Sequence, residues 1–196
     1  VPLVSEINFN FIFASEEYGT FQCAYSDAFA FLLTDISTGI TTNLAVVPNT
    51  TTPVSVVTIR DNLYNDFCES VNPEYFDAFY GFGGLDPLGS PTNFNGITVP
   101  LTATSAVIPG NQYHIKLVIA DRLDNSFDSA VFLEGGSLDI GNIELGEDFL
   151  QANNTALCAG TSYTITTGLN PALYTFVWTN GVNVIPNETG PNLNIT

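Results

Sequence analysis

Acidic residues gather in two short segments of the sequence, and they are its best candidates for chemistry. Asp121, Asp124 and Asp128 fall within one eight-residue stretch, while Glu16 and Glu17 are adjacent and Asp27 follows ten residues later. Carboxylate oxygens, with Asn and Ser oxygens nearby, are the hard ligands that Ca²⁺ prefers. We therefore predict a calcium site built from these six acids, although the spacing does not match an EF-hand loop. The alternative is that the Asp and Asn side chains cap turns through hydrogen bonds to the backbone.

The same acids are poor candidates for catalysis. A glycosidase needs two carboxyl groups on either side of the scissile bond, whereas adjacent residues of a strand, such as Glu16 and Glu17, point to opposite faces. His114 is the single histidine, and no Gly-x-Ser-x-Gly nucleophile elbow is present. We predict that the chain is not an enzyme.

Three cysteines divide unevenly along the chain. Cys23 and Cys68 lie in the first part and Cys158 lies alone in the second. An odd number in a secreted chain indicates a missing partner. We expect a Cys23–Cys68 disulfide, and we expect Cys158 to pair with a cysteine beyond Thr196 in a longer protein.

The overall charge excludes several classes of partner. The 196 residues carry 20 acids against three bases, for a net charge of −17. Such a surface repels phosphate backbones and anionic lipid, and no apolar run approaches the ~20 residues of a membrane span. We expect no nucleic acid binding and no membrane insertion.

Alternating apolar residues predict an all-β fold. The clearest case is 6–13, with Ile7, Phe9, Phe11 and Phe13 on one face, and the other candidates are 28–33, 43–47, 54–60, 96–103, 113–120 and 129–133. This period and the β-branched and aromatic residues are typical of strands. Seven or more short strands separated by turns favour a β-sandwich, and we expect one of jelly-roll type over residues 1–145.

The segment 61–95 interrupts this pattern. It contains eight aromatic residues among Gly, Pro, Asn and Asp. A loop of this length is usually functional or tied down, and the expected Cys23–Cys68 disulfide would anchor it.

Residues 146–196 resemble the first half of an immunoglobulin-like β-sandwich. Cys158 is followed about 20 residues later by Trp178, and an Asn-Gly turn comes next at 180–181. Tyr174, Phe176 and Trp178 share one face of the stretch 174–178. A cysteine, a buried tryptophan and a hairpin in this order are typical of the immunoglobulin fold.

Four blocks in the first part resemble the choice-of-anchor L domain. They are FASEEY at 13–18, SDAFAFLL at 26–33, the run at 43–56 and the run at 114–137. The resemblance covers about residues 3–140. It implies a large secreted protein of Bacteroidota, exported by type IX secretion, with Cys23 and Cys68 similar to the cysteine pair of one subset. Members usually have a further N-terminal part of the domain.

From these observations we expect a non-catalytic segment of an extracellular adhesin or filament protein that mediates attachment at the cell surface. Its partners would be copies of itself or other subunits of a surface assembly. Two alternatives stay open: a calcium-dependent carbohydrate-binding module that recognises glycans on a target surface, and an accessory domain of a secreted hydrolase.

Overall fold

The computed structural model describes residues 1–122, 126–141, 145, 156–158, 160–169, 171–172 and 174–195. The chain divides into two compact units, Val1–Ile140 and Gly141–Thr196. This division lies five residues before the boundary expected from the sequence. Each unit is built from antiparallel strands, and the described residues form no α-helix.

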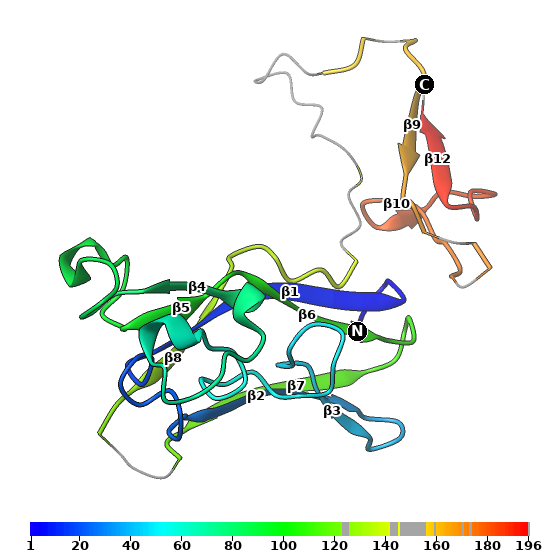
Figure 1. Ribbon diagram of the computed structural model, residues 1–196. Helices are drawn as coiled ribbons and strands as arrows, with labels where there is room; N and C mark the ends of the chain where they lie inside the picture. The colour runs from blue at the N-terminus through cyan, green and yellow to red at the C-terminus, as the bar shows by residue number, and fades with distance from the viewer. Residues whose placement is uncertain are drawn as a thin grey trace. The chain divides into compact units, whose positions relative to one another are not determined.

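The first unit is a β-sandwich of two antiparallel sheets (Figure 1). In one sheet, β1 (Glu6–Ser15) lies at the centre, between β8 (Ser129–Leu133) on one side and β5 (Gly96–Thr98) and β6 (Leu101–Ala106) on the other. The short strand β4 (Phe76–Phe79) pairs with β5. The second sheet has the order β3-β2-β7, formed by Thr41–Asn43, Ala28–Asp35 and Tyr113–Ala120. These layers explain why β1 and β2 alternate so regularly, since each has one face in the core.

Aromatic rings from β1 and β2 form the core between the sheets. Phe31 is 2% exposed, and its ring centroid lies 5.0 Å from those of Phe9 and Phe11. Phe13 stacks on Phe29, also at 5.0 Å. Pairs of this kind contribute about 0.5–1.5 kcal/mol each beyond the burial of their area. The alternation seen in the sequence therefore places every one of these rings in a single cluster.

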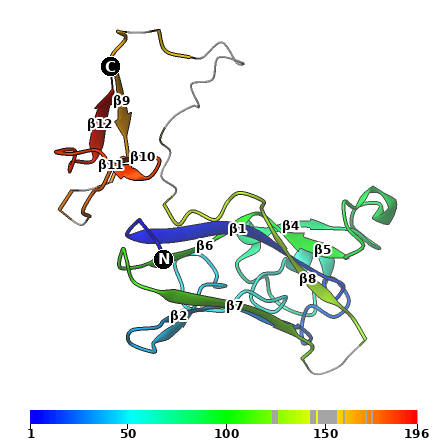
Figure 2. The ribbon, with the colours of Figure 1, turned by 180° about the vertical axis from the view of Figure 1, so that it is seen from behind.

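One lateral side of the sandwich is closed by chain that is not in a long strand. Residues 44–59 follow edge strand β3, and Val47, Val54, Val56 and Ile59 are fully buried against the core. The opposite lateral side has β7 as the edge strand of one sheet and β8 as the edge strand of the other. Figure 2 shows these two strands from behind.

Three predicted strands differ from the structure. The segment 43–47 contributes only the end of β3 and a single bridge from Val46 to Pro53. The segment 54–60 forms turns, because the Ser55 carbonyl accepts from the Thr58 and Ile59 amides and the Thr58 hydroxyl bonds to the Pro53 carbonyl. Local bonds of this kind compete with sheet pairing. The segment 96–103 divides into β5 and β6 on either side of Pro100, whose ring nitrogen has no hydrogen to donate.

The loop 61–95 has structure that the sequence pattern did not reveal. It contains β4 and three single-turn 3₁₀ helices, Asn62–Tyr64, Pro73–Tyr75 and Pro87–Gly89. The side chains of Asp61 and Asp86 accept from the backbone N–H two residues on, at 2.9 and 3.0 Å, and so cap the first and the third of these helices.

The second unit contains short antiparallel pairs. Strand β9 (Tyr163–Thr166) pairs with β12 (Asn192–Ile195), and β10 (Thr179–Asn180) forms a hairpin with β11 (Asn183–Val184). The Trp178 indole N–H donates to the Gly190 carbonyl at 2.9 Å, and its side chain is half-buried. The stretch 174–178 is not a strand, although Tyr174, Phe176 and Trp178 alternate with exposed neighbours as predicted. That the second unit is part of an immunoglobulin-like domain stays a prediction.

Candidate functional site

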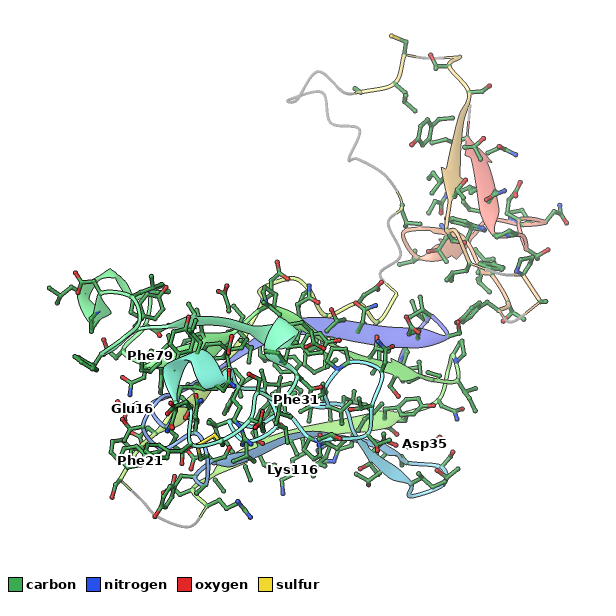
Figure 3. The ribbon with its side chains drawn as sticks, in the orientation of Figure 1. Glu16, Phe21, Phe31, Asp35, Phe79 and Lys116 are labelled. Carbon is green, nitrogen blue, oxygen red and sulfur yellow. A yellow bond between two sulfur atoms is a disulfide. The ribbon has the colours of Figure 1, made fainter. Side chains whose placement is uncertain are left out.

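Four chain segments meet at one end of the sandwich: the end of β1, the start of β2, the end of β7 and the start of β8. The register places Ser15 opposite Ser129 in one sheet and Ala28 opposite Ala120 in the other. Predicted site residues lie on each segment, so we call this region the acidic end and define it by Glu16, Glu17, Asp27, Asp121 and Asp128. Figure 3 shows Glu16 here, far along the sandwich from Asp35 at the other end of β2.

Glu17 is the buried centre of the acidic end. Its side chain is 1% exposed, and Oε2 accepts from the Ser15 hydroxyl at 3.2 Å and from the Asp27 backbone N–H at 3.0 Å. The Ser129 hydroxyl donates to the Ser15 hydroxyl oxygen at 2.9 Å. Because Ser15 ends β1 and Asp27 immediately precedes β2, the carboxylate of Glu17 ties one sheet to the other.

The other carboxylates of this region also accept from backbone N–H groups. Oε2 of Glu16 accepts from Asp128 at 3.2 Å, while the Glu16 N–H donates to the Asp128 carbonyl at 3.0 Å. Oδ1 of Asp27, which is 4% exposed, accepts from the Arg122 N–H at 3.3 Å. Bonds from carboxylates to backbone donors are the turn-capping role that the sequence left open as an alternative to metal binding.

The structure describes five of the six predicted calcium ligands. Glu17 bonds to the Asp27 backbone and Glu16 to the Asp128 backbone, and Asp121 is exposed just after β7. Asp124 lies outside the described residues. Within the ranges that the structure describes, no three His, Cys, Asp or Glu side chains are grouped closely enough to hold a metal ion. Calcium binding stays a prediction for this region.

Tyr18 is a feature of this end that the sequence analysis missed. It is 1% exposed, and its hydroxyl has no hydrogen-bond partner among the described residues. Burial, and secondarily the negative charge of Glu17, raises the pKa of Tyr18 far above its usual value. The ring packs against Phe76 and against Gly96, where an added Cβ would lie 2.5 Å from the ring. The only sequence signal was its place beside two acids.

A disulfide anchors the long loop beside the acidic end. Cys23 and Cys68 are bonded, with their Cα atoms 5.5 Å apart, as predicted. Hydrogen bonds reinforce this attachment: the Asn65 amide donates to the Gly19 and Thr20 carbonyls, at 2.9 and 3.1 Å. The Arg60 guanidinium donates to three backbone carbonyls, those of Gln22, Val57 and Glu69. The loop is thus held to the residues that follow β1.

A family model for the choice-of-anchor L domain matches residues 1–139, which is most of the chain and almost the whole first unit. The chain belongs to the choice-of-anchor L domain family. Membership makes the first unit a surface-associated domain of a secreted protein. No curated protein and no solved structure matches the chain. Within the described residues, no helix is both long and apolar enough to cross a membrane.

The large apolar side chains of the choice-of-anchor L domain's loop 61–95 include a buried group and an exposed group. Phe76 and Phe79 are buried, and Tyr64 and Tyr75 pack against the same core. These rings stabilise the loop and are not available to a ligand. The large apolar side chains that point into solvent are Leu63, Phe67, Phe82, Leu85 and Leu88. We call these five residues the exposed loop set.

Proposed function

We propose that this chain is a non-catalytic segment of an extracellular adhesin or filament protein, and that its choice-of-anchor L domain takes part in attachment through the exposed loop set. The observation that carries this proposal is the exposure of apolar side chains on an anchored loop. Phe67, Phe82 and Leu88 are at least 94% exposed. The chain beside Phe67 is nevertheless held by the disulfide, and the chain beside Phe82 and Leu88 by bonds from Leu85 N–H to the Phe79 carbonyl and from Leu88 N–H to the Asp86 carboxylate. Large apolar side chains in such positions mark interaction sites.

Rigidity supports a role in contact. A loop that is ordered before binding loses less conformational entropy on binding than a flexible loop does. Aromatic side chains are also enriched at the energetic centres of protein interfaces. The exposed loop set combines both properties.

A non-catalytic role agrees with the use of the acidic residues. Glu17 and Asp27 are buried and accept hydrogen bonds from the backbone, so they hold the two sheets together. Glu16 is bonded in the same way to Asp128. These hydrogen bonds support a structural role for the three carboxylates.

The test is retention of beads coated with the full chain on chitin, cellulose and polystyrene surfaces under flow. Phe67→Ser and Phe82→Ser together are expected to reduce retention by about tenfold or more, since burying one such side chain contributes about 1.5–3 kcal/mol. Val182→Ser is the matched control, because Val182 is 96% exposed but lies in the second unit. Equal retention of wild type and the double variant on every surface would contradict the proposal.

A calcium-dependent carbohydrate-binding module is the second candidate. It is favoured by the short distance in sequence between the disulfide-anchored residues and the acidic end, and by the ring of Phe21, which packs on Phe127 with centroids 4.5 Å apart beside Asp128. A glycan array probed in Ca²⁺ and again in EDTA separates the two functions. Binding that EDTA abolishes supports the module, and calcium-independent retention on apolar surfaces supports attachment by the loop.

A further inference from the structure

The side of the sandwich between β7 and β8 is open. Leu117 and Ile119 of β7 and Leu133 of β8 lie on the inward faces of their strands, opposite the core residues Phe31, Phe29 and Phe11 in the register of the sheets. They are nevertheless 47%, 48% and 53% exposed. Two adjoining hollows share Leu117 and Leu133, and the first reaches down to Phe31. We call this region the β7–β8 groove and define it by Phe31, Leu117, Ile119, Val131 and Leu133.

The two lateral sides of the same sandwich differ. On the β3 side, residues 44–59 fill the space between the sheets and their apolar side chains are fully buried. On the β7–β8 side, no described segment takes that place. Inward-facing apolar side chains of a sandwich are normally covered, because their burial is the main favourable contribution to folding. The groove is therefore a part of the core that the described residues leave uncovered.

Some backbone groups along the groove also lack a hydrogen-bond partner in the described part of the chain. β7 pairs with β2 along its whole length, and β8 pairs with β1. In an antiparallel pair, alternate residues direct their N–H and C=O groups to opposite sides of the strand. Half of those groups on β7 therefore face away from β2, and no described residue bonds to them. An edge with free hydrogen-bonding groups and apolar side chains is a template for another strand.

The positive charge on β7 favours a partner strand that is acidic or neutral. Lys116 is exposed on the outward face of β7, and Arg122 follows the end of the strand. The third base, Arg60, already donates to three carbonyls. Lys116 is thus the only charged side chain of β7, whereas the acids Asp121, Asp128 and Glu134 lie at the strand ends beside the groove. The outward face of β7 therefore carries a positive charge. An added strand with acidic or neutral side chains on its outward face would complement it.

The width of the opening indicates a single strand. Two packed sheets lie about 10 Å apart, which leaves room for one layer of side chains and none for a second folded sandwich. We propose that the β7–β8 groove binds an extended segment of another polypeptide, which pairs with β7 and adds a fourth strand to the sheet β3-β2-β7. The segment has apolar side chains at alternate positions, which cover Leu117, Ile119 and Leu133, and acidic or neutral side chains between them. This site is separate from the exposed loop set and does not depend on the attachment proposed above.

The test uses the ¹⁵N-labelled full chain and a synthetic peptide, acetyl-Thr-Val-Glu-Val-Thr-Val-Glu-Val-Thr-amide. Its control has the same composition with the valines placed together. The alternating peptide is expected to slow hydrogen exchange at every second amide of Tyr113–Ala120, with little effect from the control. Strand addition of this kind takes its affinity from backbone hydrogen bonds and its specificity from alternate side chains.

Variants decide whether the groove is responsible. Leu117→Glu and, on the facing strand, Leu133→Glu are each expected to weaken peptide binding by about tenfold, because each removes an apolar contact. Val182→Glu in the second unit is the control for added charge, and circular dichroism checks that every variant folds. Equal binding of both peptides, or unchanged binding in both folded groove variants, would overturn the proposal. Protection of β7 that depends on protein concentration without peptide would also overturn it, since the occupant would then be a second copy.

Discussion

Removal of the Cys23–Cys68 disulfide should destabilise the first unit by about 4 kcal/mol. The two cysteines are 45 residues apart in sequence, and closing a loop of this size in the unfolded chain removes entropy equivalent to about 4 kcal/mol at 25 °C. In the folded state, the bonds from Asn65 and Arg60 hold the loop independently of the sulfur atoms. The double substitution Cys23→Ser and Cys68→Ser should therefore act mainly through the unfolded state.

Urea unfolding followed by far-ultraviolet circular dichroism measures the loss. Trp178, the single tryptophan, lies in the second unit, so its fluorescence provides an internal control that should not change. Cys158→Ser should be neutral in residues 1–196, because Cys158 is exposed and the other two cysteines are bonded to each other. A loss below about 1 kcal/mol in the double variant would refute the reasoning, since the unfolded chain would already be compact around these residues.

Three further predictions concern the acidic end and the second unit. Tyr18→Phe should raise stability by about 1 kcal/mol, because it removes a buried hydroxyl that has no hydrogen-bond partner among the described residues. Since the pKa of Tyr18 is raised in the folded state, wild type should lose stability as pH rises above 10.0, where the unfolded tyrosine ionises, and the variant should lose less. Calcium should raise the melting midpoint by the equivalent of about 2.7 kcal/mol when free Ca²⁺ is 100 times the dissociation constant, and Asp124→Asn and Asp128→Asn should abolish this effect. A wild-type midpoint that EDTA leaves unchanged would contradict the predicted calcium site. Trp178 should emit at shorter wavelength than free tryptophan and resist iodide quenching, and a solvent-like emission maximum would count against the immunoglobulin-like interpretation.

Strand positions with strict alternation were predictable. The segments 6–13, 28–33, 113–120 and 129–133 correspond to β1, β2, β7 and β8. β1 and β2 alternate most strictly because one face of each strand is directed to the core, and that period is visible without any knowledge of the partner strand. The disulfide was equally accessible, since only two cysteines lie in the first unit.

The errors have a common physical origin. Val54, Val56 and Ile59 are as apolar as any strand residue, but they are buried from an irregular segment in which the local hydrogen bonds of Ser55 and Thr58 replace a strand ladder. Burial alone does not specify a conformation. The short strand β4 was not predicted, because Phe76–Phe79 is extended only through its pairing with β5, which the local sequence does not show.

The sequence by itself determined the class of the fold, the central strands, the disulfide and the acidic, non-basic character of the surface. These properties depend on residue type and local spacing, which the chain states directly. Only the tertiary structure decided the hydrogen-bond partners of the buried acids, because bonds such as those of Glu17 join residues next to separate strands. It also decided that Leu117 and Leu133 are exposed while equally apolar residues are buried, since exposure depends on which segments cover each side of the sandwich.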